Sequence, residues 1–152
     1  MKLAINSTSS KHTEQIAAKI GRNLEGGEVI ELISDLGGGK TVFVRGLVAG
    51  TDSKDQVASP TFTISKIYSC PKFAIHHFDF YRLDDPGIVA LELQEVLNDP
   101  KIVVIIEWAE IVRNVLPKKR LTLQIEHSEG NARQLNFSYP KDLNYLMAGL
   151  VK

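Results

Sequence analysis

The feature that most constrains this chain is the glycine-rich segment Ser34–Thr41, SDLGGGKT, because apolar stretches flank it on both sides. Residues 28–33, EVIELI, predict a strand with Val29, Ile30, Leu32 and Ile33 buried. The seven residues after the loop, VFVRGLV, predict a helix that ends near Gly50. Strand, glycine-rich loop and helix in this order are the arrangement of a phosphate-binding loop.

The composition of the loop fits that chemistry. Glycines allow the backbone angles that turn N–H groups toward an anion, and the helix that follows points its positive end at the same anion. Lys40 is expected to reach the β- and γ-phosphates, and the Thr41 hydroxyl to ligate Mg²⁺. The Walker pattern has glycine where this chain has Ser34, but it retains Gly39 before the lysine. The alternative is a plain glycine-rich turn with an exposed lysine; a dinucleotide fingerprint is disfavoured because Gly-x-Gly-x-x-Gly does not occur here.

Two acidic residues follow apolar strands. Glu107 comes directly after IVVII, and Asp79 lies at the end of FAIHHFDF. Because ligands of open α/β sheets bind beyond the carboxyl ends of the strands, both acids are candidates for catalysis and for holding Mg²⁺. Glu107 would hold the metal directly or through water, and Asp79 would do the same or orient the attacking water. The alternative is that each acid only ends a strand in solvent.

The neighbours of these acids leave two questions open. His77, Asp79 and Tyr81 alternate, so they share one face of a strand. That face is either a hydrogen-bonded polar row beside the nucleotide or the wet face of an edge strand. Trp108, directly after Glu107, either belongs to the core or packs near the nucleotide.

Hydrophobic periodicity and turn signals predict the remaining elements. Helices are expected over residues 13–24, from the turn at 84–87 through Leu97, and over 141–151; strands are expected over 61–69, 72–80, 102–106, 121–126 and 133–139, the last two forming a hairpin. The run IVVII is typical of a parallel strand that is buried on both faces. These elements predict an α/β fold: one three-layer, P-loop NTPase-like domain over residues 1–152, with a mixed, partly parallel central sheet.

Net charge and cysteine content indicate which cellular compartment and which kinds of partner suit this chain. Lys plus Arg equals Asp plus Glu, 18 each, so no overall charge draws the chain to nucleic acid or membrane. The cluster Lys118–Arg120 is expected to be a solvated turn. Cys70 is the only cysteine, and the chain shows neither a secretory signal nor a run of about 20 apolar residues. We therefore expect a cytoplasmic protein without a membrane segment.

Four motifs in this order and spacing resemble the TsaE (YjeE) family: LGGGKT, SPTF at 59–62, HFDFYRL at 77–83 and IEW at 106–108. The last two are specific to the family, whereas the phosphate loop is shared with many NTPases. The resemblance spans nearly the whole chain. The family loop usually begins with glycine and has alanine at position 38, so Ser34 and Gly38 are departures from it.

The resemblance implies a small ATPase that uses ATP and Mg²⁺. It also implies action with the TsaB–TsaD pair in N6-threonylcarbamoyladenosine modification of tRNA, with tRNA met mainly through these partners. Catalysis would fall to Lys40, Asp79 and Glu107, and metal binding to Thr41, Glu107 and Asp79. Thr61 would belong to a switch-like loop. The implied nucleotide-binding residues are Thr13, Asp35, Leu36, Gly37, Gly38, Gly39, Lys40, Thr41, Val42, Trp108 and Arg133, with Thr13 and Arg133 near the adenine end.

Two other functions use the same loop. A small-molecule kinase would need an arginine-rich lid and an acceptor pocket, yet there is no arginine between Gly87 and Pro100. A nucleotide-binding switch would bind ATP and report it to partners without turnover. The products distinguish the three functions, because an ATPase releases free phosphate from ATP alone, whereas a kinase needs an acceptor.

Overall fold

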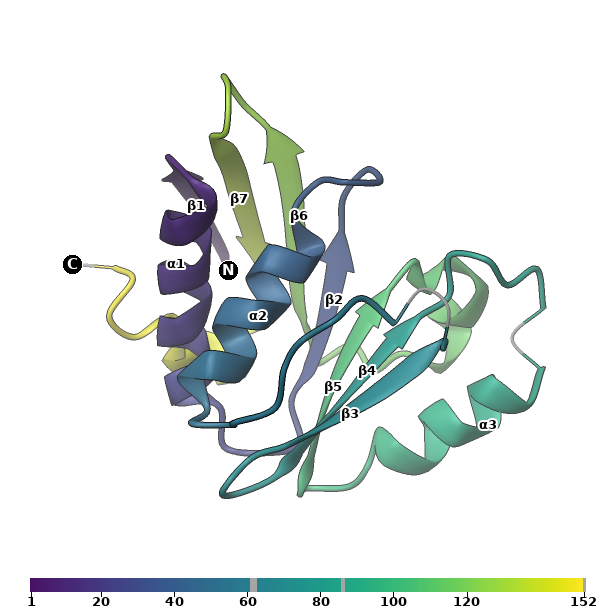
Figure 1. Cartoon of the computed structure of the whole chain (residues 1–152). Helices are drawn as coiled ribbons and strands as arrows, with labels where there is room; N and C mark the ends of the chain where they lie inside the picture. Colours follow the sequence, from purple (N-terminus) through teal and green to yellow (C-terminus); the bar gives the residue numbers. More distant parts are fainter. Residues whose placement is uncertain (61–62, 86, 152) are drawn as a thin grey trace.

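The computed structural model describes residues 1–60, 63–85 and 87–151, and in this part of the chain seven strands form one sheet (Figure 1). Their order across the sheet is β1-β7-β6-β2-β5-β4-β3. The bounds are β1 Lys2–Ser7, β2 Val29–Ile33, β3 Ser65–Ser69, β4 Ala74–Asp79, β5 Ile102–Glu107, β6 Leu121–His127 and β7 Arg133–Ser138. The predicted hairpin is confirmed as the antiparallel pair β6–β7.

The centre of the sheet is parallel and its margins are antiparallel. Strands β6, β2, β5 and β4 run in the same direction, whereas β3, β7 and β1 pair antiparallel at the two sides. The predicted mixed, partly parallel sheet is therefore confirmed. In the register of the central strands, Leu32 lies opposite Glu107, and Glu107 lies opposite Asp79. The carboxyl ends of β2, β4 and β5 consequently meet at one edge, the upper edge in Figure 1.

Helical segments cover both faces of the sheet. The α-helices are α1 Ser10–Asn23, α2 Lys40–Gly50 and α3 Gly87–Val96; the 3₁₀ segments are η1 Ala109–Val115 and η2 Lys141–Met147. Helices α1 and α2, which lie in front of the sheet in Figure 1, share a core with Ile30, Leu32 and Ile105. Helix α3 and η1 share a second core with Val29, Val104 and Ile106. Because successive strand residues point to opposite faces, the three layers predicted from the sequence are present.

Helices α1 and α2 approach each other so closely that their backbones touch. A Cβ atom built on Gly50 would lie 2.2 Å from the carbonyl oxygen of Ala18, and one on Gly46 would lie 2.4 Å from that of Glu14. On the opposite helix, a Cβ on Gly21 would lie 2.1 Å from the carbonyl oxygen of Leu47. These glycines are needed for space, and the close contact fixes α2, and with it the loop at its start, against α1.

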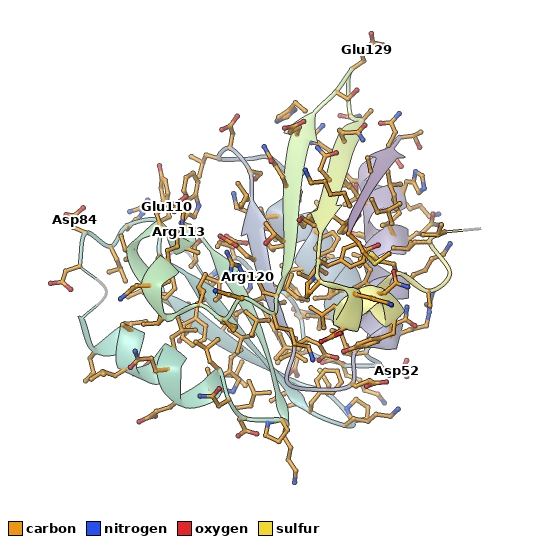
Figure 2. All side chains as sticks on the ribbon, turned by 180° about the vertical axis from the view of Figure 1, so that it is seen from behind. Asp52, Asp84, Glu110, Arg113, Arg120 and Glu129 are labelled. Atoms are coloured by element: carbon orange, nitrogen blue, oxygen red, sulfur yellow. The ribbon has the colours of Figure 1, made fainter. Side chains whose placement is uncertain are left out.

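The far face of β2 carries a buried charge. Glu31 is 5% exposed, and its Oε2 accepts hydrogen bonds from Arg120 Nε at 2.7 Å and from Thr122 Oγ1 at 3.3 Å. Figure 2 shows Arg120 near the middle of this side of the sheet. The predicted solvated turn holds for Lys118 and Lys119, which are exposed, but not fully for Arg120, whose side chain is 25% exposed and offsets the charge of Glu31. The predicted burial of Ile33 is also wrong: this last residue of β2 pairs only with β6, and Ile33 is 39% exposed.

Three segments differ from the predicted elements. The closing helix expected over 141–151 is the 3₁₀ segment η2, which ends at Met147. Strand β3 begins at Ser65 rather than 61, after Ile64 with φ 67°; residues 61 and 62 lie outside the described part. Strand β1 was not predicted, because it is a margin strand defined by pairing with β7 at the other end of the chain.

No helix within residues 1–60, 63–85 and 87–151 is both long enough and apolar enough to cross a membrane.

The contact between α1 and α2 predicts that Gly50→Ala destabilises the protein, although alanine favours a helix by up to ~1 kcal/mol over glycine. The added methyl group would overlap the Ala18 carbonyl oxygen, and overpacking costs about 1–3 kcal/mol. Urea denaturation measures the difference, with Ala49→Ser at the exposed neighbouring position as the control. Equal stability of Gly50→Ala and wild type would show that the two backbones can move apart freely.

Candidate active site

The loop between β2 and α2 is shaped by glycines that serve two different needs. Gly37 and Gly39 have φ values of 75° and 107°, a region that L side chains rarely adopt. Gly38 does not have such an angle, but a Cβ there would lie 2.5 Å from Ser34 Oγ. Gly39 is the N-cap of α2 and makes no side-chain cap bond, and no acidic residue lies in the first turn. The start of α2 therefore presents uncapped N–H groups to the pocket described below.

Lys40 extends back across the loop instead of into solvent. It is 8% exposed, and its Nζ donates to Ser34 Oγ at 2.9 Å, Ser34 O at 3.3 Å and Asp35 O at 3.4 Å. The same ammonium lies 4.9 Å from the centre of the Trp108 ring, a cation–π contact. The Trp108 ring in turn packs on Tyr81, with 4.9 Å between ring centres. The interpretation of Lys40 as an exposed lysine on a plain turn is therefore wrong.

The two acids lie side by side and are both buried. Asp79 and Glu107 are each 3% exposed and are opposite each other on β4 and β5. Glu107 Oε1 is 3.2 Å from Nε2 of the fully buried His77, and Asp79 Oδ1 accepts a hydrogen bond from the Tyr81 N–H at 2.9 Å. Since β4 is paired on both sides and both His77 and Asp79 are buried, the wet edge-strand interpretation is wrong. Tyr81 lies beyond the end of β4 and is 42% exposed.

One pocket of about 280 Å³ brings the loop and the acids together. Its lining residues are Leu36, Gly37, Gly38, Gly39, Lys40, Thr41, Val42, Ser59, Asp79, Tyr81, Glu107 and Trp108. Ten of the predicted site residues are in this set. Trp108 is one of them, and it also packs against the core shared by α3 and η1. Sequence reasoning did not assign Ser59 or Tyr81 to the site, although both stand in the motifs SPTF and HFDFYRL.

A second pocket of about 220 Å³ lies on the other side of the loop and shares Gly37, Gly39 and Val42 with the first. It contains the two residues predicted near the adenine end, Thr13 and Arg133. Its complete lining is Ser10, Thr13, Gly37, Gly39, Val42, Ile125, Asn131 and Arg133. Nothing in the sequence singled out Ser10, Ile125 or Asn131, because they join the site only through the packing of α1 and the β6–β7 hairpin beside the loop.

Hydrogen bonds fix the two predicted residues of the second pocket. Thr13 Oγ1 is 2.7 Å from the hydroxyl of the buried Ser7, and Arg133 Nε donates to Gly38 O at 3.1 Å. The arginine thus contacts the back of the phosphate loop from the hairpin. The first bond ties α1 to the end of β1, and the second ties β7 to the phosphate loop that both pockets share.

The residue after Glu107 has an unusual backbone conformation. Trp108 has φ 56° and ψ 52°, the left-handed region that bulky residues seldom adopt. The turn at this position ends β5, starts η1 and brings the indole over Lys40. Packing of the ring against Tyr81 offsets the backbone cost.

Tyr68 on β3 connects the acids to the segment before the predicted switch. Its hydroxyl donates to Ala58 O at 3.0 Å, and its ring lies 6.5 Å from that of His77. Burial raises the pKa of Tyr68, and the negative charge of Glu107 adds to the effect. Tyr68 therefore remains a neutral donor at physiological pH and holds Ala58, next to the pocket residue Ser59.

One predicted residue of the described part, Asp35, lines neither pocket. Asp35 is exposed and contributes its backbone carbonyl, which accepts a hydrogen bond from Gly38 N–H at 2.9 Å. Thr61 lies outside the described residues. Within the described part of the chain, no group of three or more His, Cys, Asp or Glu side chains is placed to hold a metal ion.

Comparisons with known proteins identify relatives of this chain. The model of the family "Threonylcarbamoyl adenosine biosynthesis protein TsaE" matches residues 7–135. The chain is 35% identical to the TsaE protein of Rickettsia prowazekii, over 82% of this chain and 87% of that protein. It is 33% identical to the Bacillus subtilis TsaE protein, over 84% of this chain and 80% of the other.

A solved structure gives the same result for the fold. The crystal structure of Bacillus subtilis YdiB superposes with a TM-score of 0.77 at 26% identity, and the match covers 99% of this chain and 94% of that one. The matched family segment includes the phosphate loop, both acids and Arg133. On these grounds the chain belongs to the TsaE family of threonylcarbamoyladenosine biosynthesis proteins.

Proposed function

We propose that this protein is an ATPase that binds the phosphates of Mg·ATP in the larger pocket and hydrolyses ATP to support the TsaB–TsaD complex in tRNA modification. The observation that carries the proposal is the convergence of the Lys40 loop with Asp79 and Glu107 in one pocket at the carboxyl ends of parallel strands. Ligands of open α/β sheets bind at such edges.

The phosphates are held by charge and by the backbone. The uncapped N-terminus of α2 supplies N–H donors and the positive end of the helix dipole. Lys40 adds a full positive charge, and Trp108 and Ser34 hold its ammonium near the loop. The Thr41 hydroxyl lies in the same pocket. Preorganised donors and charges of this kind stabilise the charge that develops during phosphoryl transfer.

The acids fit a divalent cation. Two carboxylates buried on neighbouring strands repel each other, and a cation between them and the phosphates offsets that repulsion. We assign Thr41, Glu107 and Asp79 as the protein's ligands to Mg²⁺, directly or through water, since this ion takes few protein ligands together with phosphate oxygens. Bound there, Mg²⁺ would neutralise charge on the transferred phosphate.

The acids also have a role in hydrolysis. Attack on the γ-phosphate needs a water molecule that is held in line with the bond that breaks. The carboxylate at the carboxyl end of β4 can accept a hydrogen bond from this water. Asp79 is oriented by the Tyr81 N–H, and Glu107 by His77. We assign the water to Asp79 and a larger share of metal binding to Glu107.

The smaller pocket accommodates the nucleoside. It adjoins the phosphate loop through Gly37 and Gly39 and contains Thr13 and Arg133. An adenine and ribose in this pocket would place the triphosphate across the loop toward Lys40. The position between α1 and the β6–β7 hairpin gives both apolar and hydrogen-bonding walls.

The names of the relatives supply the pathway, tRNA threonylcarbamoyladenosine biosynthesis. We assign TsaB and TsaD as protein partners and expect contact with tRNA mainly through them. The equal numbers of acidic and basic residues agree with this, since the chain has no net charge that would attract a polyanion.

Lys40→Ala should abolish ATP hydrolysis while the protein stays folded. The variant removes the charge nearest the phosphates, and a single preorganised group is worth about 10²–10³ in rate. Phosphate release from Mg·ATP measures the effect, and Lys101→Ala, at an exposed position, is the matched control. Unchanged turnover in Lys40→Ala would remove the proposed function.

Mg·ATP should stabilise the protein against heat. At about 100 times the dissociation constant, linkage predicts ~2.7 kcal/mol, or a rise of about 5–10 °C in the melting temperature of a domain of this size. Glu107→Gln keeps an acceptor for His77 but removes the charge, so it should shrink the part of the rise that depends on Mg²⁺. If the rise in wild type is the same with EDTA as with Mg²⁺, the assigned metal ligands are wrong.

Hydrolysis should be slow in the isolated protein and should accelerate when TsaB and TsaD from the same source are added. The pocket is bounded on one side by the segment that includes Ser59, which a partner surface could close over the phosphates. Steady-state phosphate release with and without the purified pair measures the acceleration. A fast isolated enzyme that ignores both proteins, with no complex on size exclusion in ATP, would contradict this assignment.

A further inference from the structure

Ser34 has a role that follows from its contacts with Lys40 and Gly38. Its hydroxyl is the nearest hydrogen-bond partner of the Lys40 ammonium, at 2.9 Å, and the same oxygen donates to Asp35 O at 2.9 Å. A hydroxyl that gives its proton to a carbonyl keeps its lone pairs for the ammonium. The Ser34 side chain is therefore oriented to accept from Lys40.

The position of Ser34 also explains Gly38. A Cβ at position 38 would lie 2.5 Å from Ser34 Oγ and 2.7 Å from Ser34 Cβ, with Asp35 O at 2.9 Å. Gly38 is buried, and its backbone is held by its N–H bond to Asp35 O and by the bond from Arg133 Nε to its carbonyl. The backbone therefore cannot move away easily, and the Ser34 side chain fills the space that a side chain at 38 would need.

We propose that Ser34 is a positioning residue for Lys40, the phosphate-binding lysine, and that glycine is needed at position 38 because the Ser34 side chain occupies the space there. The serine hydroxyl keeps the Lys40 ammonium over the loop, between the loop carbonyls and the Trp108 ring. The ammonium is then in place before a nucleotide arrives and does not have to be ordered by it. The effect on nucleotide affinity rests on the proposed function, whereas the position of Lys40 and the fit between Ser34 and Gly38 do not.

The first test is a double-mutant cycle of Ser34 and Lys40, in which calorimetry measures the affinity of each variant for Mg·ATP. Ser34→Ala removes the hydroxyl and keeps the Cβ atom. It should weaken binding about three- to tenfold in the wild-type background, because one of three acceptors of a charged donor is lost. In the Lys40→Ala background the same change should have almost no effect, since its consequence passes through the lysine. Ser128→Ala, at an exposed position of the β6–β7 turn, is the matched control.

An equal loss of affinity in both backgrounds would overturn the positioning role, because it would show general damage to the loop. No loss in either background would also overturn it.

A second readout does not need a nucleotide. Trp108 is the only tryptophan, and the Lys40 ammonium lies over its ring. Ser34→Ala should therefore change Trp108 fluorescence in the free protein in the direction that Lys40→Ala does. If wild type binds no Mg·ATP, the proposed function fails, and this readout still decides whether Ser34 positions Lys40. Emission identical to wild type in Ser34→Ala, together with altered emission in Lys40→Ala, would overturn the inference.

The fit between Ser34 and Gly38 is tested by thermal denaturation. Gly38→Ala alone should lower the melting temperature by about 5 °C, the usual scale of overpacking in a domain of this size. When Ser34→Gly is already present, Gly38→Ala should cost less than half of that, because two of the three close contacts are gone. The same loss in both backgrounds would show that the Asp35 carbonyl alone excludes a side chain at 38.

Discussion

The position of the candidate site depends on the register of three parallel strands, β2, β5 and β4. In this register Leu32, Glu107 and Asp79 lie in one row across the sheet. The parallel register brings the carboxyl ends of the three strands to one edge, so the phosphate loop starts two residues beyond the row, next to both acids. A shift by one residue would turn an acid toward the opposite face. The register is held by apolar side chains on both faces of β5, from Val103 to Ile106, which are at most 1% exposed.

Side chains in and beside this row carry groups that are costly to bury, and each of these groups has a specific interaction partner. Glu107 is next to His77, Asp79 accepts from the Tyr81 backbone, and Lys40 is held by three oxygens and an indole ring. Buried charges are tolerated when such partners satisfy them. The pocket is lined both by these two acids and by Lys40 with the start of α2, and this mixture of charges agrees with the proposed binding of Mg·ATP.

The sequence predicted the parts of the fold that depend on local pattern. The strand before the loop, the helix after it, the buried strand IVVII and the closing hairpin all have strong periodicity or turn signals, and all are present. Strand β1 escaped prediction because its partner is β7, more than 120 residues away. The 3₁₀ form of η2 and the left-handed Trp108 are set by tertiary packing, which local propensity does not describe.

The sequence was enough to select candidate residues for the site, but it did not predict the contacts between their side chains. Lys40, Thr41, Asp79 and Glu107 could be chosen because loop chemistry and strand ends point to them. The pairs His77–Glu107 and Ser34–Lys40 depend on distances between backbones that no spacing in the sequence gives. A side chain at position 38 would clash with Ser34, and this constraint also comes from the fold of the loop and not from sequence spacing.

The proposed function depends most on where a nucleotide binds. A crystal structure of this protein with Mg²⁺ and a non-hydrolysable ATP analogue tests the proposed site most directly. We expect a triphosphate wrapped by residues 37–41 with Lys40 on its β- and γ-phosphates. We also expect Mg²⁺ within direct or water-mediated reach of Thr41 and Glu107, and the adenine in the pocket of Thr13 and Arg133. A triphosphate bound away from Lys40, or a metal that contacts none of Thr41, Asp79 and Glu107, would contradict the proposed site.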